Sequence, residues 1–235
     1  MPIETETQWI NQDGWVYRVR PPSAGGVQHP VLLMLHGWTG DENSMWIFAR
    51  RLPEADWKLA PRAPIQAPGG GYGWNDSLPD ASVDLTAYKP MVDRLLGWLD
   101  SWASDQRLDL AALDLLGFSQ GAFMVYALGL LYPQRVRLSG ALAGYLPASW
   151  LAQISPGAIQ GKRYYLAHGT RDETIPVERA RESARLLTAA GARVTYCEAP
   201  VGHKLSVNCL NGLEEFFRAA GSAPADQRDQ PEKHP

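Results

Sequence analysis

The chain has 235 residues, of which 45% are hydrophobic and 20% are charged, and its formal net charge at pH 7 is −3. This length is enough for one sizeable core and does not require two, so we expect a single domain over residues 1–220. Binding to nucleic acid or to an anionic membrane surface depends on clustered Lys and Arg, and this charge balance gives no general basis for either. We therefore expect neither partner.

The first ten residues, MPIETETQWI, contain neither the basic nor the apolar stretch of a secretory signal. The longest apolar run, 122–132, is shorter than the roughly 20 residues that cross a bilayer. The two cysteines, Cys197 and Cys209, are too few for a disulfide framework, which fits a reducing cytoplasm but leaves a single bridge between them open. The sequence thus predicts a cytoplasmic protein without a membrane span.

Strand-like and helix-like segments alternate along the chain. Half-exposed alternation predicts a strand over 15–22, and a continuous apolar run predicts a buried strand over 30–38. The next predicted elements are helix 44–53, strand 57–64, helix 84–105, strand 113–119, helix 121–133, strands 138–146 and 163–169, helix 177–191, strand 193–200 and helix 210–221. This order is typical of an α/β fold with a doubly wound, mostly parallel sheet covered on both faces. The polar end, 221–235, has little to bury and is expected to be a mobile tail.

The segment LDLLGFSQGAFMVYALG, 113–129, places Ser119 between two glycines where a buried strand passes into a helix. Gly117 and Gly121 allow the strand and the helix to approach closely while the serine adopts an unfavourable backbone conformation. The helix that follows adds its N-terminal dipole to the site. Gly and Ser are also common in ordinary turns, but in this strand-turn-helix setting we interpret Ser119 as a nucleophile.

A serine nucleophile needs a base and an acid that orients the base, because an alcohol is a poor nucleophile at neutral pH. In sheets of this kind the acid and then the histidine follow the serine, each on a loop after a strand. Asp172 follows the predicted strand 163–169, and His203 follows the predicted strand 193–200. Glu173 and Glu198 are alternative acids, and loop position favours Asp172.

Other histidines and the cysteines have a simpler interpretation. His36 and His168 end predicted strands and each precedes a glycine, which favours structural imidazoles that tie down a loop. The spacing of Cys197, His203 and Cys209 matches no common zinc pattern. We expect no metal.

Two backbone N–H groups are expected to bind the oxyanion that forms when Ser119 attacks an ester. One belongs to Gln120, the residue after the nucleophile. The other belongs to Trp38, which follows the permissive Gly37 on the loop after the apolar segment VLLMLHG, 31–37.

The substrate pocket is less well specified by the sequence. The segment 145–161 is too short for a large helical cap, so we expect an open site. Trp46, Trp74 and Trp150 are candidate aromatic walls of the pocket. Core positions are an equal alternative for Trp74 and Trp150.

Four separated motifs resemble the phospholipase/carboxylesterase group of α/β-hydrolases, which includes bacterial carboxylesterases and acyl-protein thioesterases. The motifs are LHGWTGDE (35–42), GFSQG (117–121), AHGTRDETIPV (167–177) and VGHKLS (201–206). The resemblance covers residues 30–217 in the same order and implies the α/β-hydrolase fold without a large cap domain. It also implies a catalytic triad of Ser119, Asp172 and His203, an oxyanion hole from the amides of Trp38 and Gln120, and no cofactor. Relatives commonly have Leu at the position of Trp38, so the resemblance implies the backbone donor but leaves open the shape of the acyl pocket and the chain-length preference.

The function implied by this resemblance is that of a serine carboxylesterase. It would hydrolyse short- to medium-chain esters, presented as small molecules, through an acyl-serine intermediate. An acyl thioesterase or a lysophospholipase that uses the same residues is the alternative among enzymes. A hydrolase fold reused as a ligand-binding module is the non-enzyme alternative, against which the intact Ser, Asp and His motifs argue. A homodimer through exposed aromatic side chains is left open.

Overall fold

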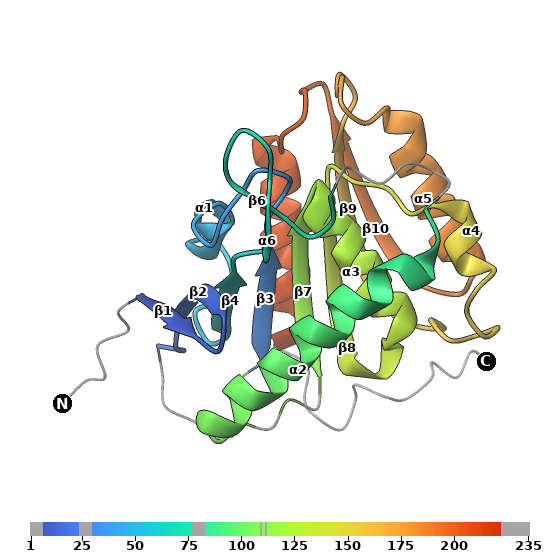
Figure 1. Ribbon diagram of the computed structural model, residues 1–235. Helices are drawn as coiled ribbons and strands as arrows, with labels where there is room; N and C mark the ends of the chain where they lie inside the picture. Colours follow the sequence, from blue (N-terminus) through green and yellow to red (C-terminus); the bar gives the residue numbers. More distant parts are fainter. Residues whose placement is uncertain (1–6, 24–29, 77–82, 109, 111, 222–235) are drawn as a thin grey trace.

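The computed structural model describes residues 7–23, 30–76, 83–108, 110 and 112–221, so the expected tail, apart from Gly221, lies outside the described residues. Within them, eight strands form one sheet in the order β1-β2-β4-β3-β7-β8-β9-β10 (Figure 1). The strands are Gln8–Gln12 (β1), Trp15–Arg20 (β2), Val31–Leu35 (β3), Trp57–Pro61 (β4), Leu113–Phe118 (β7), Val136–Leu142 (β8), Arg163–Gly169 (β9) and Arg193–Ala199 (β10). Two short strands, Ile65–Gln66 (β5) and Tyr72–Gly73 (β6), form a separate hairpin.

The sheet is parallel from β4 to β10 and antiparallel at its other end, where β2 pairs with β4 and β1 pairs with β2. This confirms the predicted α/β fold with a mostly parallel sheet. The sequence pattern missed β1 because four of its five residues are exposed, so the strand carries no hydrophobic alternation.

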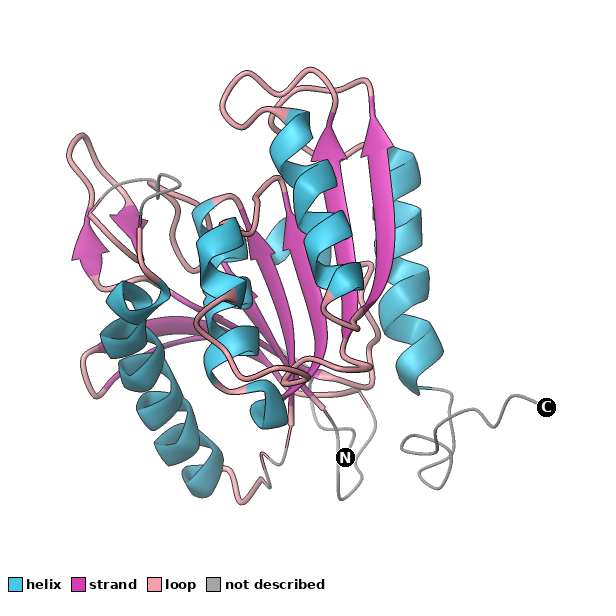
Figure 2. Ribbon diagram, turned by 90° about the vertical axis from the view of Figure 1, so that its right-hand side faces the viewer, coloured by secondary structure: helices cyan, strands magenta, loops and turns pink. Residues whose placement is uncertain are grey.

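Helices cover both faces of the sheet, as Figure 2 shows. One face carries Lys89–Asp105 (α2), Gln120–Leu131 (α3), Ala148–Leu151 (α4) and Val177–Ala189 (α5), with the short 3-10 helices Leu85–Tyr88 (η1) and Pro133–Arg135 (η2) beside them. The other face carries Trp46–Ala49 (α1) and Val207–Gly221 (α6). Between β8 and β9 the structure places only α4 and turns, so there is no large cap.

Burial on both faces explains the continuous apolar run at β3. Val31, Leu33 and Leu35 pack in the core under α2 and α3, whereas Leu32 and Met34 pack in the core under α1 and α6. Successive side chains of a strand point to opposite faces, so a strand with helices on both sides is apolar at every position. The sheet therefore divides the interior into two cores.

Two predicted helices differ from those observed. The predicted helix 84–105 starts as η1 and becomes α-helical at Lys89, so Pro90 lies in the first turn of α2, where a missing N–H has no cost. The predicted helix 44–53 shrinks to the four residues of α1. Asp41 holds the preceding residues in a turn, because its carboxylate accepts bonds from the backbone N–H groups of Asn43 and Ser44.

The two cysteines form a disulfide that joins β10 to α6. This settles the alternative that the sequence left open for Cys197 and Cys209. His203 lies midway along the chain segment that the disulfide closes.

Lys58 in β4 is an unusual buried cation. Its side chain is 0% exposed, and its Nζ donates to the carbonyl oxygen of Pro53 at 2.5 Å. The pKa of Lys58 is lowered from 10.5 to about 8, chiefly by burial and also by the nearby cation of Arg20, while Asp56 and Glu54 act in the opposite direction. The folded chain therefore releases this proton at a lower pH than the unfolded chain does.

This difference makes stability depend on pH. Above the folded pKa of about 8 and below the unfolded value of 10.5, the unfolded chain binds a proton that the folded chain does not, so raising the pH stabilises the fold. We expect the free energy of unfolding of the wild type, relative to Lys58→Met, to rise by about 2 kcal/mol between about pH 7 and about pH 9.5. Urea unfolding of both proteins across this range measures the difference, and a difference that does not change with pH would contradict the prediction.

Candidate active site

Ser119 lies where β7 ends and α3 begins. Its backbone has φ 52° and ψ −116°, a conformation that L residues rarely adopt. Its N–H donates to the carbonyl oxygen of Leu142 in β8 at 2.8 Å, and its own carbonyl accepts from the N–H of Ala122 in α3 at 2.9 Å. These two bonds hold the strained residue in place from both sides.

Two glycines make this turn sterically possible. A Cβ on Gly117 would lie 2.2 Å from the carbonyl oxygen of Gly121, and a Cβ on Gly121 would lie 2.0 Å from the carbonyl oxygen of Leu35 at the end of β3. Both obstacles are backbone atoms, which cannot rotate away. The glycines on either side of Ser119 are therefore required for α3 to begin directly over β7 and β3.

The structure brings Ser119, His203 and Asp172 together from the loops after β7, β10 and β9. Ser119 Oγ lies 3.0 Å from His203 Nε2, and His203 Nδ1 lies 2.7 Å from Asp172 Oδ2. Because a carboxylate only accepts, Nδ1 carries the hydrogen and Nε2 is left to accept the hydrogen of the serine hydroxyl. This row can therefore remove a proton from Ser119.

Asp172 is held by more than the histidine. Its side chain is fully buried, and its Oδ1 accepts the backbone N–H groups of Thr174 and Ile175, each at 2.9 Å. A buried carboxylate is costly unless its oxygens are bonded, and both oxygens of Asp172 are. The alternatives are placed elsewhere: Glu173 is exposed, and Glu198 accepts two bonds from Arg181.

His168 ties down the loop that carries Asp172, as the sequence suggested. Its side chain is 1% exposed, and its Nε2 lies 2.8 Å from the carbonyl oxygen of Ile175 and 3.3 Å from Asp172 Oδ2. A hydrogen on Nε2 can be shared between the carbonyl oxygen of Ile175 and Asp172 Oδ2. The imidazole thus links the end of β9 to the far side of the same loop.

The loop of His203, residues 200–206, is called the base loop, and that of Asp172, residues 170–176, the acid loop. The N–H of Arg171 donates to the carbonyl of Val201 at 3.0 Å, so the two loops are bonded directly. The ring of Phe118 packs edge-on against His203, with centroids 5.1 Å apart. The His203 side chain keeps 25% of its surface exposed, so a substrate can reach it.

The residues expected to supply the two N–H donors lie beside Ser119. Gln120 is the first residue of α3, where backbone N–H groups have no carbonyl of the same helix to donate to. Its side chain bonds the N–H of Trp74 at 2.8 Å and the carbonyl of Asn75 at 3.1 Å. Trp38 follows Gly37, on which a Cβ would lie only 3.2 Å from Ser119 Cβ.

His36 fixes the start of the loop between β3 and α1, called the β3–α1 loop. Its Nδ1 donates to the carbonyl of Gly37 at 2.7 Å, and its Nε2 accepts the N–H of Ala63 at 2.9 Å. Burial lowers the pKa of His36, so the ring stays neutral in this tautomer. The expected structural imidazole is confirmed here, and it holds the backbone just before Trp38.

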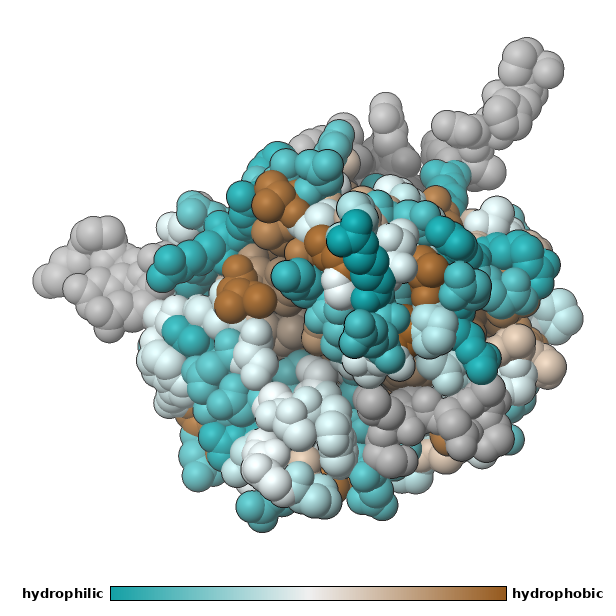
Figure 3. Space-filling view, turned by 90° about the horizontal axis from the view of Figure 1, so that it is seen from above, coloured by the Kyte–Doolittle hydropathy of each residue, from teal (hydrophilic) through white to brown (hydrophobic). Residues whose placement is uncertain are grey.

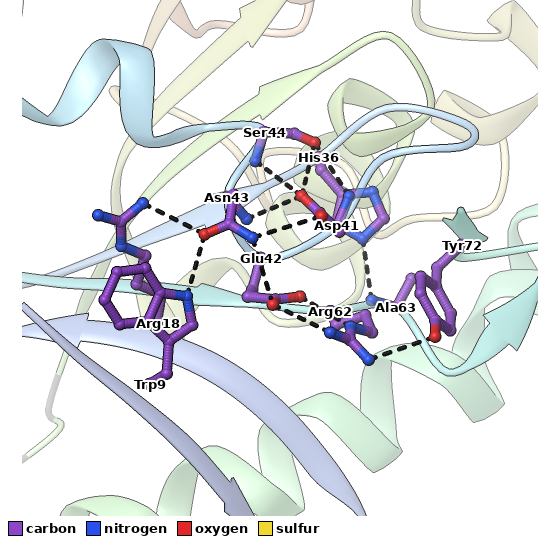
Figure 4. Close-up of polar contacts among 10 residues, drawn as sticks. All are labelled: Trp9, Arg18, His36, Asp41, Glu42, Asn43, Ser44, Arg62, Ala63 and Tyr72. Atoms are coloured by element: carbon purple, nitrogen blue, oxygen red, sulfur yellow. Dashed lines mark hydrogen bonds and ion pairs between the residues drawn. The ribbon is translucent and has the colours of Figure 1, made fainter. Parts of the chain in front are cut away.

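Further polar contacts brace the rest of the β3–α1 loop (Figure 4). Glu42, 4% exposed, accepts two bonds from the guanidinium of Arg62 at 2.7 and 2.9 Å. Asn43 Oδ1 accepts from Trp9 Nε1 at 3.0 Å and from Arg18 Nη1 at 3.2 Å. The loop is therefore tied to β1, β2 and the chain after β4, which limits how far Trp38 can move.

A pocket of about 550 Å³ opens on the side of α1 and α6, and its lining includes Phe118 and Lys204, the chain neighbours of Ser119 and His203. Figure 3 shows hydrophobic residues gathered around a hollow on this upper face. The described lining residues are apolar or uncharged, except for Lys204. They are Gly37, Trp38, Thr39, Gly40, Ser44, Met45, Ile47, Phe48, Phe118, Lys204, Leu205 and Leu210.

Three tryptophans expected at the pocket wall lie elsewhere. Trp74 and Trp150 are 1% and 0% exposed, and their indole N–H groups donate to backbone carbonyls at 2.8 and 2.7 Å. Trp46 packs on the guanidinium of Arg18, 4.5 Å from its ring centroid. The correction is that Trp74 and Trp150 belong to the core, because each buried indole finds a backbone acceptor there, while Trp38 does line the pocket.

Sequence reasoning missed most of the pocket wall. Ile47 and Phe48 come from α1, and Leu205 and Leu210 come from the base loop and α6. The one available signal was that α1 follows the LHGWTGDE motif closely in the sequence, which could have indicated a position near the site. Which side of so short a helix faces the site depends on tertiary contacts that no local pattern contains.

Within the described ranges, His, Cys, Asp and Glu side chains form no group of three that could hold a metal ion. Cys197 and Cys209 are bonded to each other, so neither is a thiolate. In the same part of the chain, the helices are all too short or too polar to cross a membrane.

A mostly parallel sheet with a serine on a strained turn, hydrogen-bonded through a histidine to an aspartate, defines a serine hydrolase of the α/β-hydrolase class. The sequence profile of the family described as phospholipase/carboxylesterase matches residues 22–220. The chain therefore belongs to the phospholipase/carboxylesterase family and is an ester or thioester hydrolase. This membership favours the enzyme over the ligand-binding module.

Individual relatives agree with this assignment. The chain is 28% identical to acyl-protein thioesterase 1 of Eremothecium gossypii in an alignment of 211 positions that covers 80% of this chain and 87% of the relative. The carboxylesterase of Bacillus cereus superposes with a TM-score of 0.77 at 22% identity, over 89% of this chain and 96% of that one. A carboxylesterase from Mesorhizobium loti gives 0.73 at 23% identity, over 90% and 98%. These two structures support the fold.

The glycine geometry around Ser119 gives a direct test. We expect Gly121→Ala to lower the free energy of unfolding by at least about 3 kcal/mol, because the new Cβ meets backbone that must shift. Gly97→Ala is the matched control, since Gly97 is an exposed helical glycine with nothing within 4 Å of the added Cβ. That control should gain about 0.5–1 kcal/mol. Equal effects of the two substitutions in urea unfolding would refute the steric account.

Proposed function

We propose that this protein is a serine carboxylesterase that hydrolyses short- to medium-chain esters through an acyl-serine intermediate. The observation that carries the proposal is the row from Ser119 through His203 to Asp172, with contacts of 3.0 and 2.7 Å, beside an apolar pocket of about 550 Å³. The row supplies a nucleophile with its base, and the pocket supplies a place for an apolar acyl chain.

In the first step, His203 Nε2 takes the proton of Ser119 as Oγ attacks the ester carbonyl carbon. The N–H groups of Trp38 and Gln120 donate to the oxyanion that develops. His203 then gives its proton to the leaving alcohol. Asp172 keeps the imidazole in one tautomer and stabilises the imidazolium.

In the second step, water replaces the alcohol. His203 removes a proton from the water, which attacks the acyl carbon, and the same two N–H groups hold the second oxyanion. The proton returns to Ser119 Oγ as the acid leaves. The partial exposure of His203 allows water to enter after the alcohol has gone.

The pocket sets which acyl chains are favoured. Each methylene that leaves water for an apolar wall contributes about 0.8 kcal/mol, or roughly fourfold in kcat/KM, until the pocket is full. The ring of Trp38 lines the pocket and also lies against Gly73, on which a Cβ would be 2.2 Å from it. We therefore expect the optimum at medium length.

Thioester hydrolysis is the second candidate. The observation that favours it is the relative named acyl-protein thioesterase 1, at 28% identity. The same serine, histidine and N–H donors serve an oxoester and a thioester. Comparing kcat/KM for an oxoester and a thioester with the same acyl chain separates the two activities.

Two expectations from the sequence remain proposals. Cytoplasmic location rested on cysteine usage, and the Cys197–Cys209 disulfide is instead the kind of bond that oxidising compartments favour.

A homodimer has some surface to use, since Trp9 is 57% exposed. Sedimentation analysis of the purified chain tests the dimer.

The central experiment is hydrolysis of p-nitrophenyl esters from acetyl to palmitoyl by the wild type and by Ser119→Ala. We expect the substitution to lower kcat by about four to six orders of magnitude, because it removes the attacking atom. Ser149→Ala, at an exposed serine of α4, is the matched control and should keep wild-type activity. Substantial turnover by Ser119→Ala would rule out the nucleophile.

The pocket assignment predicts a shift in chain length. Leu210→Trp fills part of the pocket, so kcat/KM for the longer esters should fall by at least about tenfold while the acetyl ester is hydrolysed at close to the wild-type rate. The same ester series measures this. A uniform loss at every chain length would count against this pocket as the acyl site.

A further inference from the structure

The Cys197–Cys209 disulfide spans the two ends of the base loop. Cys197 lies in β10, which precedes the loop, and Cys209 lies in the first turn of α6, which follows it. β10 is the last strand of the sheet and pairs with β9 alone among the described strands. β10 therefore has sheet hydrogen bonds along one edge, and the disulfide adds a covalent link between this strand and α6.

The two halves of the base loop are held differently. Before His203, the acid loop bonds the chain at Ala199 and Val201, through the N–H groups of Thr170 and Arg171. After His203, α6 packs its buried side chains against the sheet. Cys209 adds two further links, because its carbonyl accepts a hydrogen bond from Tyr165 Oη in β9 at 2.6 Å and its Sγ is bonded to Cys197. The disulfide is therefore the one covalent cross-link between the sheet and the half that follows the histidine.

Small shifts of the base loop affect the chemistry more than the binding. His203 Nε2 must stay 3.0 Å from Ser119 Oγ, and a displacement of about 1 Å can cost roughly 100-fold in rate. Much of the pocket wall, including Trp38, Ile47 and Phe48, lies outside the cross-linked segment. Loosening the segment should therefore change kcat more than KM.

We propose that the Cys197–Cys209 disulfide is a positioning element for His203, so that the enzyme turns over fully only while the bond is closed. The inference rests on the proposed role of His203 as the base. It assigns the cysteines a function in the reaction rather than in stability alone, and it makes turnover sensitive to thiol reductants.

The structure also indicates how reduction proceeds. Cys209 is 1% exposed whereas Cys197 is partly exposed, so a thiolate of a dithiol reductant attacks Cys197 Sγ. The S–S bond breaks, Cys209 leaves as a thiolate, and a mixed disulfide forms on Cys197. The second thiol of the reductant then attacks the reductant sulfur that is bonded to Cys197 Sγ, and Cys197 is released as a thiolate. The dithiol ends as a cyclic disulfide, and its two electrons and two protons end on the cysteines.

The test compares oxidised and reduced wild-type enzyme. Protein is treated with dithiothreitol and then desalted, because the remaining thiol would attack the ester. Desalting is done without oxygen so that the cysteines stay reduced, and the protein is assayed with a medium-chain p-nitrophenyl ester. Thiol titration counts the free cysteines, and circular dichroism at the assay temperature shows that both forms are folded. We expect kcat to fall at least about tenfold on reduction with KM within about threefold, and reoxidation to restore kcat.

The Cys197→Ser/Cys209→Ser double variant is the control. It should match the reduced wild type in kcat and should not respond to dithiothreitol. Equal kcat in the folded oxidised and reduced forms, or a change in KM alone, overturns the positioning role and leaves the esterase intact. Purified protein that carries two free thiols even after mild oxidation overturns it as well. Absence of turnover in both forms instead counts against the proposed function, and the inference falls with it.

Discussion

The site depends on the close approach of α3 to β7 and β3 at Ser119. Backbone oxygens of Gly121 and Leu35 occupy the places where side chains of residues 117 and 121 would begin. A backbone conformation as unusual as that of Ser119 costs about 1–3 kcal/mol and persists only where its surroundings fix it. Here they do, because eleven residues of α3 are buried and the helix cannot shift to relieve the turn. The strain is therefore held by the core, and Oγ stays at the carboxyl edge of the sheet.

Two buried imidazoles that play no part in proton transfer hold the loops around this edge. His36 fixes the backbone before Trp38, and His168 fixes the loop of Asp172. Each bonds a carbonyl on its own loop, so each loop is closed internally before it meets its neighbours. A row of hydrogen bonds such as that from Ser119 to Asp172 works only if its members arrive already oriented, and these bonds provide that orientation.

The sequence was informative where the chemistry is local. The glycines around Ser119 and the order of Asp172 and His203 along the chain could be predicted, because each follows from what one turn or one strand end requires. The walls of the pocket could not be predicted. A tryptophan in the sequence looks the same whether its ring faces a ligand or, as for Trp74 and Trp150, its indole N–H donates to a backbone carbonyl in the core. Exposed β1 lacked any pattern, and the pairing of Cys197 with Cys209 depends on how α6 lies against β10.

The β3–α1 loop has two roles, and α1 shares only one of them, the pocket wall. The loop carries the backbone of Trp38, a proposed donor to the oxyanion, and the same residue's ring forms part of the pocket wall. Remodelling the pocket through Trp38 therefore risks the rate as well as the selectivity. Ile47, 73% exposed at the pocket, lies on a helix that contributes no residue to the proposed triad or oxyanion hole. New acyl preferences can arise there while the machinery of the reaction stays untouched, which makes α1 the natural place for substrate range to diverge.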